Sequence, residues 1–391
     1  MDYPKPHIPT FPILSLQSFA VPQGEHVPSI LDFPLVKFVT SGRVAIALAL
    51  QQMKIGKDDK VLLPAYHCTA MVEPIIWVGA TPVFYKIHPD TSVDLEDVRS
   101  RLDSSTKLIL VAHYFGFPQD MAKIRNFCDE HRIFLLEDCA HSFFGEFEGR
   151  PLGSFGDYAV ASSMKFFPIY EGGCLVSSRH DLASLMLTSA GAGFELKAML
   201  NVLEKGFEYG RLPFLQRLIH GPLRLKNFIW NTLKERILKE KSTLGPGASE
   251  GGFGFEAKWV SKRSALISTY LIRKVSKKRI AENRRQNYVK FLQTLTGLPG
   301  CYFLFPDLPK GVFPYVFPLV VDDPEKRFRA LKNAGIPVIR FGEFLWEGME
   351  ATTCKTSVDL SRRVLQFPCH QELSQQEMAW MISEIRTVLL S

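Results

Sequence analysis

Short apolar runs alternate with helical patterns between about residues 40 and 190, and this alternation restricts the fold more than any other feature. The apolar runs are typical of buried strands, at residues 61–66, 82–87, 107–113, 133–136, 158–161 and 174–176. Helical patterns lie between them, at residues 43–53, 69–78, 95–102 and 121–131. This spacing predicts an α/β fold in three layers, with a mainly parallel central sheet covered by helices on both faces. Ligands of such sheets bind at the carboxyl ends of the strands, where the connecting loops meet.

The chain has 391 residues, which is enough for two domains. Between Lys197 and Lys241, ten Lys and Arg residues stand against four Asp and Glu residues, and helices are expected at 196–203, 212–219 and 228–238. A Gly-rich connection at 245–254 follows this basic segment, 196–242. A basic helix at 273–295, strands at 315–321 and 337–340, and a closing helix at 375–389 come next. We expect a large domain at 1–255 and a smaller C-terminal α+β domain at 256–391.

Composition excludes several classes of protein. Seven cysteines are scattered without a C-x-x-C pair, which is typical of reduced thiols in the cytoplasm, and no metal site is expected. Neither a signal peptide at the N-terminus nor a run of about 18 apolar residues is visible, so a cytoplasmic location is expected. The net charge of +7 is modest for this length, and no nucleic-acid recognition motif accompanies it.

The segment from Ser41 to Ala45 opens a predicted helix and contains Gly42. Backbone N–H groups at the start of a helix are free to bind a phosphate, and a glycine allows close approach. The residues that would supply these groups are Gly42, Arg43 and Val44. A serine followed by glycine is also an ordinary way to begin a helix, so this segment is informative only together with others.

Asp138 and His141 follow the apolar run that ends at Leu136. A carboxylate there can pair with a protonated pyridine nitrogen and keep the ring an electron sink. A carboxylate that caps the next helix is the alternative. His141 is three residues further along and could contact the ring or its phenolic oxygen, although a single histidine is more often structural.

Lys165 follows the next predicted strand, and Ser162 precedes it by three residues. A lysine at the mouth of a pocket can form an imine with an aldehyde, and a serine hydroxyl can hydrogen-bond a phosphate. Most lysines are solvated surface residues. The segment Glu171-Gly172-Gly173 argues against that alternative, because it returns directly to a strand and leaves Lys165 in a tight loop.

Taken in order, these motifs resemble the DegT/DnrJ/StrS sugar aminotransferases. The likeness is clear over about residues 38–180 and looser over 260–391. The segments that carry it are Ser41-Gly42-x-x-Ala45, Pro64, Gly79-Ala80-x-Pro82-Val83-Phe84, Gly116-Phe-Pro-x-Asp120-Met121, Glu137-Asp138-x-Ala140-His141, Gly149-x-x-x-Gly153-Ser154-x-Gly156-Asp157, Lys165-x6-Gly172-Gly173 and Leu365-Gln-Phe-Pro368-Cys-His370-Gln371-Glu-Leu373.

The resemblance implies a pyridoxal 5'-phosphate enzyme of fold type I, a homodimer whose active sites lie between the subunits. Lys165 would be the Schiff-base lysine, Asp138 the acid at the ring nitrogen and His141 a ring contact. The phosphate and ring would be held by Gly42, Arg43, Val44, His67, Cys68, Asp138, His141, Ser162 and Lys165.

Three departures from the family indicate a divergent branch. Cys68 stands where these enzymes often carry an aromatic over the ring, and Tyr66 or His67 are the alternatives for that contact. The stretch between Asp157 and Lys165 is two residues shorter than in many sugar aminotransferases. The basic segment 196–242 is the third departure.

The expected reaction moves an amino group from glutamate or glutamine to a keto substrate, for which the resemblance suggests a nucleotide-linked keto sugar. The freed amine of Lys165 would be the general base. One alternative is dehydratase-like chemistry, which relatives with histidine in place of the lysine perform. Another is a binding or regulatory protein that keeps the fold. The basic segment 196–242 predicts either peripheral contact with the inner membrane face or a solvated face packed on the protein.

Overall fold

The computed structural model describes residues 3–20, 26–216, 254–347 and 353–391. Its larger sheet has seven strands in the order β1-β9-β8-β5-β4-β2-β3. The strands are β1 (Lys37–Val39), β2 (Lys60–Pro64), β3 (Thr81–Tyr85), β4 (Thr106–Ala112), β5 (Phe134–Asp138), β8 (Tyr158–Ser162) and β9 (Gly173–Val176). Neighbours from β3 to β8 are parallel, and β9 is antiparallel to both β8 and β1. The prediction of a mainly parallel sheet is confirmed.

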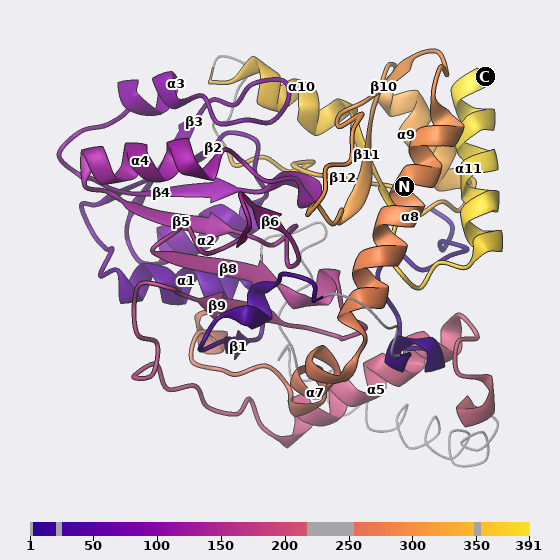
Figure 1. Cartoon of the computed structure of the whole chain (residues 1–391), viewed down its shortest axis with the longest axis horizontal. Coiled ribbons are helices and arrows are strands. Elements are labelled where there is room, and N and C mark those ends of the chain that lie inside the picture. The colour runs from indigo at the N-terminus through magenta and orange to yellow at the C-terminus, as the bar shows by residue number, and fades with distance from the viewer. Residues whose placement is uncertain (1–2, 21–25, 217–253, 348–352) are drawn as a thin grey trace.

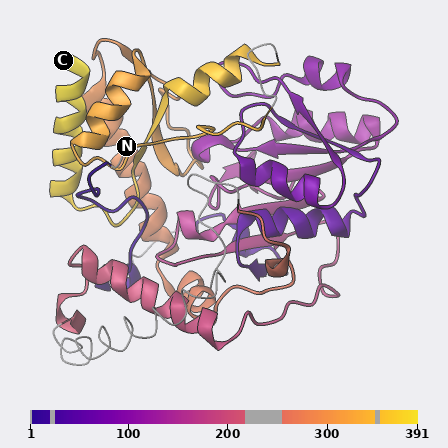
Figure 2. The ribbon, with the colours of Figure 1, turned by 180° about the vertical axis from the view of Figure 1, so that it is seen from behind.

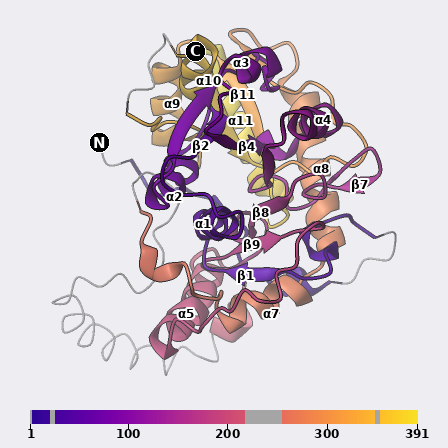
Figure 3. The same ribbon diagram turned by 90° about the vertical axis from the view of Figure 1, so that its left-hand side faces the viewer.

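Helices cover both faces of this sheet (Figures 1 and 3). On one face lie α1 (Gly42–Gln52) and α2 (Thr69–Trp77), and on the other lies α4 (Met121–His131). The short α3 (Leu95–Ser100) precedes β4. Because both faces are covered, the parallel strands are almost wholly apolar, and the sequence pattern was therefore continuous rather than alternating.

A smaller antiparallel sheet forms from the C-terminal part, in the order β10-β11-β13-β12. Its strands are β10 (Cys301–Phe303), β11 (Val316–Val321), β12 (Ile339–Arg340) and β13 (Val364–Pro368). Helices α9 (Pro324–Asn333), α10 (Lys355–Arg363) and α11 (Gln375–Leu390) lie around it, as the view from behind shows (Figure 2). This is the expected smaller α+β unit.

The N-terminal residues lie against this smaller unit. The backbone N–H of His7 donates to the carbonyl oxygen of Gly335, and its ring lies beside Trp380, with centroids 5.3 Å apart. The Nε2 atom of His370 contacts the carbonyl oxygen of Pro9 at 2.9 Å.

A hairpin of β6 (Glu146–Phe147) and β7 (Arg150–Pro151) extends from the loop after β5.

The helix expected at 273–295 is confirmed from Lys277 to Leu295, but the prediction placed its start four residues too early. The structure has α7 (Leu266–Lys274) and α8 (Lys277–Leu295), separated by Val275 in an extended conformation. The Ser276 side chain caps α8 by accepting the N–H of Arg279, and the Ser276 N–H donates to the carbonyl oxygen of Ser18. The break is therefore marked both by a local serine cap and by a contact with the N-terminal part of the chain.

Of the basic segment, only residues 196–216 are described; they include most of α5 (Ala192–Glu208). The expected helix at 228–238 and most of the connection at 245–254 lie outside the described residues. Within the described part of the chain, no helix is both long and apolar enough to cross a membrane.

Candidate active site

A cavity of about 110 Å³ lies at the carboxyl ends of β2, β5 and β8 and reaches the start of α1. Asp138 is the last residue of β5 and Ser162 the last residue of β8, so neighbouring strands deliver both to the same edge of the sheet. Cys68 comes from the loop after β2. A second cavity of about 120 Å³ shares Cys68 and Lys165 with the first and extends to β12.

The first turn of α1 forms an anion-binding edge of the cavity. The side chain of Ser41 caps the helix and accepts the N–H of Val44 at 3.3 Å, whereas helix geometry leaves the N–H groups of Gly42 and Arg43 without an acceptor inside α1. The Thr40 hydroxyl also lines the cavity and is buried without a hydrogen-bond partner in the described structure. This edge suits a phosphate, because the helix dipole and the N–H groups both favour negative charge.

Gly173 fixes the position of this helix start. A Cβ at Gly173 would lie 2.4 Å from the carbonyl carbon of Ser41 and 2.6 Å from the nitrogen of Gly42, so β9 and α1 approach each other more closely than any other residue allows. The glycine is therefore required for packing rather than for a positive φ.

We expect Gly173→Ala to lower the free energy of unfolding by about 3 kcal/mol, because backbone atoms on both sides must move. It should also weaken phosphate binding at the start of α1. Gly56→Ala is the control, since its Cβ would make only an ordinary contact at 3.7 Å. Chemical denaturation of the three proteins measures the effect; equal stabilities would show that α1 can shift freely.

Asp138 is buried at the base of the cavity. Its Oδ1 accepts the N–H of Ala140 at 2.8 Å. Burial raises the pKa of this carboxyl, although the Ala140 hydrogen bond and the charges of Lys165 and His113 act in the opposite direction. A buried carboxylate of this kind is stabilised by a cationic partner, and a protonated pyridine nitrogen would supply one.

Glu137 and His113 hold the backbone around Asp138. The Glu137 carboxylate accepts the N–H groups of Gly153 at 2.9 Å, Phe155 at 2.7 Å and Gly156 at 2.5 Å, and the Nε2–H of His113 at 3.1 Å. Glu137, His113 and Cys139 have potential metal-ligand atoms within 4.8 Å of one another. Because the Glu137 oxygens are already occupied by four donors, we interpret this cluster as a rigid support for the end of β5.

Lys165 ends a short 3-10 helix, η4 (Ser163–Lys165), between β8 and β9, and lines both cavities. Its Nζ lies 5.2 Å from the centroid of the Tyr315 ring. Its positive charge partly opposes the rise that burial causes in the pKa of Asp138, and it contributes to the lowered pKa of His141. Lys165, Asp138, Cys68 and Ser162 are thus brought together, as the sequence predicted, with Gly42 and Arg43 at the same cavity.

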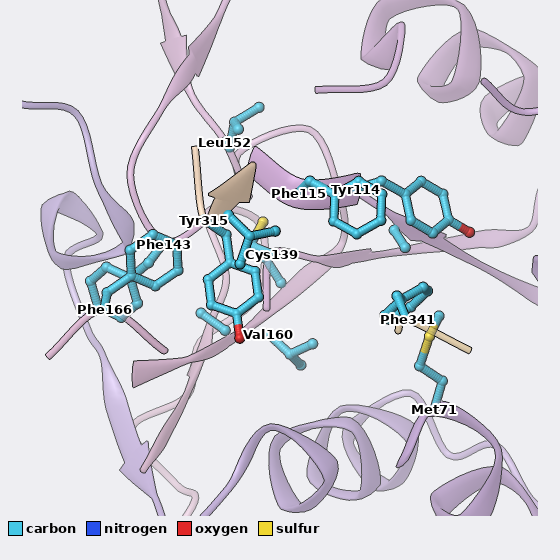
Figure 4. Packing of buried hydrophobic residues seen from close by; sticks show 14 of the residues in the cluster. Met71, Tyr114, Phe115, Cys139, Phe143, Leu152, Val160, Phe166, Tyr315 and Phe341 are labelled. Atoms are coloured by element: carbon cyan, nitrogen blue, oxygen red, sulfur yellow. The ribbon is translucent and has the colours of Figure 1, made fainter. Parts of the chain in front are cut away.

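His141 lies in the wall of the second cavity. Its ring is stacked between Tyr315 and Phe115, with centroids 4.7 and 5.7 Å away, and its Nδ1 accepts the N–H of Phe115 at 3.3 Å. Burial lowers its pKa well below the ordinary value, so the ring is neutral and carries its proton on Nε2. Figure 4 shows the apolar packing that surrounds this wall, with Tyr315, Phe341 and Phe115 among its members.

The structure does not bring His67 to either cavity. Its Nδ1–H donates to the carbonyl oxygen of Ala65 at 2.9 Å, its Nε2 accepts the N–H of Trp346 at 3.0 Å, and its ring stacks on Phe84. Burial lowers its pKa to about 4, which matches a neutral structural histidine. Tyr66 is likewise buried and stacks on Tyr114. Neither side chain lines the cavities, and Val44 contributes only the capped N–H described above.

Glu171 is a cavity residue that the sequence analysis noted only as part of a motif. Its Oε1 accepts the Ser264 hydroxyl at 2.8 Å and the Ala265 N–H at 3.0 Å, and this joins the lysine loop to the residues before α7. Burial raises its pKa to about 7, and the two hydrogen bonds only partly oppose that effect.

This raised pKa predicts a pH-dependent stability. The folded pKa lies above the ordinary value of 4.5, so the stabilising contribution is complete below pH 4.5 and is lost as the pH rises through 7. We expect Glu171→Gln, which keeps both acceptor contacts, to remove this loss and to be more stable than the wild type by roughly 3 kcal/mol at pH 8. Melting temperatures from pH 5 to 8 check it, with the exposed Glu204→Gln as control; parallel curves for wild type and Glu171→Gln would contradict it.

The cavity thus has a lysine and an acid at the strand ends of a seven-stranded, mainly parallel sheet. The fold is that of the pyridoxal-phosphate-dependent transferases of fold type I. The PLP form of the protein Spr1654 from Streptococcus pneumoniae has a similar structure, with a TM-score of 0.64 and 18% identity over 92% of this chain and 88% of that one. At this identity the likeness shows the fold.

Residues 35–211 match the model of the DegT/DnrJ/EryC1/StrS aminotransferase family. The resemblance inferred from the motifs is confirmed. GDP-perosamine synthase of Vibrio cholerae is 35% identical over 143 residues, which are 36% of this chain and 39% of that protein. L-glutamine:2-deoxy-scyllo-inosose aminotransferase of Streptomyces kanamyceticus is 34% identical over 150 residues, 38% of this chain and 35% of that protein. The matches thus span about two fifths of these relatives.

The residues at the cavity fit pyridoxal phosphate. The start of α1 and the unpartnered Thr40 hydroxyl suit the phosphate, Asp138 suits the ring nitrogen, and the amine of Lys165 suits the aldehyde. Tyr315 lines the second cavity and carried no functional signal in the sequence, and Glu171 lines the first and was noted only as part of a motif. Tyr315 lies 150 residues after Lys165 in the chain, and only the fold brings them together.

Proposed function

We propose that this protein is a pyridoxal-phosphate-dependent aminotransferase. The observation that carries the proposal is that Lys165, Asp138 and the start of α1 surround one cavity at the carboxyl ends of parallel strands. A surface lysine or a helix-capping aspartate, which were the alternatives from sequence, would not converge in this way. The match of residues 35–211 to the model of an aminotransferase family supports the same activity.

Each residue then has a role. The N–H groups of Gly42 and Arg43 and the Ser162 hydroxyl hold the phosphate, and Asp138 keeps the ring nitrogen protonated. Pyridoxal phosphate, when bound, supplies the electron sink for the reaction. Lys165 holds the aldehyde, and its Nζ, once released, moves the proton at the substrate carbon. His141, neutral with a proton on Nε2, is available as a hydrogen-bond donor at the cavity wall.

Glutamate or glutamine is the amino donor in this proposal, and a nucleotide-linked keto sugar is the acceptor. Two similar proteins support these substrate classes by name: a GDP-perosamine synthase and an aminotransferase that uses L-glutamine. The two cavities that adjoin at Lys165 and Cys68 give separate space for the cofactor and for a substrate. The second cavity contains Arg340, Glu343 and Gln366, which can bind the polar groups of a sugar or an amino acid.

A homodimer with shared active sites and a cytoplasmic location are part of the same proposal. Peripheral contact of residues 196–242 with the inner membrane face is a further hypothesis. Leu196 and Met199 on α5 are about half exposed beside Lys197, which gives a mixed basic and apolar surface. Co-sedimentation with anionic and with neutral vesicles tests it, and no preference for anionic vesicles would exclude it.

The test of the activity is a half-reaction. The purified protein is loaded with pyridoxal phosphate, L-glutamate or L-glutamine is added, and conversion of the cofactor to its amine form is followed by absorbance and chromatography. We expect conversion with at least one of the two donors, and reversal on addition of a suitable nucleotide-linked keto sugar. A bound cofactor that neither donor converts would favour dehydratase-like chemistry. A protein that binds no cofactor would favour a binding or regulatory role.

A further inference from the structure

Arg284 on α8 is fully buried and points toward the loop that carries Lys165. Its guanidinium donates to the side chain of Gln371 at 3.2 Å and to three backbone carbonyl oxygens. The carbonyl groups belong to Pro314 at 3.3 Å, Tyr315 at 2.7 Å and Lys165 at 2.8 Å. None of these four acceptors is a carboxylate. A buried cation held only by neutral acceptors is costly to fold, so its position requires an explanation.

Gln371 holds the next peptide of the same loop. Its Nε2 donates to the carbonyl oxygen of Phe166 at 2.9 Å, while its Oε1 accepts from Arg284. Two successive carbonyl groups, those of Lys165 and Phe166, are therefore bound by two side chains that also bind each other. Both side chains come from the C-terminal part of the chain, whereas η4 follows the end of β8 in the larger sheet.

We propose that Arg284 and Gln371 form a carbonyl clamp, a pair of positioning residues that fix the backbone of Lys165 and so aim its amine into the cavity. The inference rests on the proposed function, since it concerns the lysine that the cofactor would use. The clamp also sets the cavity wall. Arg284 holds the backbone of Tyr315, whose ring lies 5.2 Å from Nζ of Lys165 and stacks on His141.

The proposal also has an electrostatic part, because the guanidinium of Arg284 donates to the Lys165 carbonyl oxygen at 2.8 Å. Burial lowers the pKa of Arg284 only to about 10, so the guanidinium remains a cation at neutral pH. A cation beside the Lys165 peptide disfavours the ammonium form of that lysine, which helps an amine that must act as a nucleophile and base. Asp138 acts in the opposite direction, while His141 is neutral and Cys68 has a pKa raised by burial. Arg43 and Glu171 also line the cavity, and burial raises the pKa of Glu171 to about 7, so Arg284 adds its charge to several others at this end of the cavity.

Four variants separate geometry from charge. Arg284→Met removes both, and Arg284→Lys keeps the charge but not the set of hydrogen bonds. Gln371→Met removes no charge, but it removes the bond to the Phe166 carbonyl oxygen and the acceptor for the Nε–H of Arg284. Arg285→Met is the matched control. Arg285 also donates to backbone carbonyl groups, those of Leu308, Pro309 and Val312, but it makes no recorded contact with the lysine loop.

The first measurement is hydrogen exchange of the cofactor-free proteins at the amides of Phe166 and Phe167, which both donate to the carbonyl oxygen of Ser163. We expect exchange there to rise about tenfold in Arg284→Met, Arg284→Lys and Gln371→Met, and to stay at the wild-type rate in Arg285→Met. Wild-type rates in all three clamp variants would overturn the proposal. Because Gln371→Met removes no charge, it decides the question even if Arg284→Met fails to fold.

The second measurement is the pH dependence of Lys165 acylation by acetic anhydride, read by mass spectrometry. The midpoint should rise by about one pH unit in Arg284→Met and should stay unchanged in Arg284→Lys and Arg285→Met. An unchanged midpoint in Arg284→Met would exclude the electrostatic part. Neither measurement needs a cofactor, so a wild type that fails to bind pyridoxal phosphate overturns the proposed function alone, and the exchange rates still decide the clamp.

Discussion

Lys165→Ala is expected to abolish the borohydride-reducible chromophore that the wild type forms with pyridoxal phosphate. The reason is geometric. Lys165 lines both cavities and is the last residue of η4. The helix η4 begins directly after Ser162, which faces the start of α1. An aldehyde whose phosphate lies at that helix start is then within reach of this amine. Cofactor binding without covalent attachment should persist, because the phosphate edge and Asp138 are untouched.

The same variant should lose nearly all amino transfer. A positioned base contributes roughly 10²–10⁴-fold to a rate, and Lys165 both carries the cofactor and moves the proton, so a fall of at least about 10³-fold is expected. Lys107→Ala is the control, because the amine of Lys107 is exposed and donates a hydrogen bond to the carbonyl oxygen of Ser104, away from both cavities. Absorbance spectra before and after borohydride and initial rates measure both effects. A reducible chromophore that survives in Lys165→Ala would mean that another amine carries the cofactor.

Much of the fold was predictable because the strands of a covered parallel sheet are apolar throughout. The runs that form β2, β4 and β5 are buried on both faces, and this is what made them visible in the sequence. β1 was missed because it has only three residues and lies at the edge of the sheet, with two of them partly exposed. The break before α8 was missed even though the Ser276 cap is a local sequence signal.

The site was predictable where a functional residue is the last residue of a strand. Asp138 and Ser162 end their strands, so their place at the edge of the sheet followed from topology. The loop after β2 was harder, because the direction of each side chain in Tyr66, His67 and Cys68 depends on local loop geometry. Tyr66 and His67 turn into the protein, and Cys68 faces the cavities.

The contribution of the C-terminal part could not be predicted from sequence. Arg284, Tyr315 and Gln371 reach the lysine loop only because the smaller sheet packs beside the larger one. The division at residues 255 and 256 stays a prediction. The contacts of His7 and Pro9 with the smaller unit indicate that residues at the start of the chain are associated with its C-terminal part.

Asp138→Asn should change function and stability in opposite directions. Asparagine keeps the volume and the acceptor for the Ala140 N–H, but it carries no negative charge to hold a protonated ring nitrogen. Removing one partner of a buried ion pair costs about 4 kcal/mol, so the amino-transfer rate should fall roughly 10³-fold. The cofactor should still attach to Lys165, because that reaction does not depend on Asp138.

The cofactor-free protein should become more stable, because burial raises the pKa of the Asp138 carboxyl. The stabilising contribution of a group with a raised pKa is complete below the unfolded pKa and is lost as the pH rises through the folded pKa. At a pH above the folded pKa the wild type therefore carries the cost of a buried carboxylate, and the asparagine variant does not. The melting temperature without cofactor should thus rise in Asp138→Asn, while pyridoxal phosphate should stabilise the variant less than the wild type. A variant that is less stable without cofactor would show instead that Asp138 is needed for folding, and that its role at the ring nitrogen has to be reconsidered.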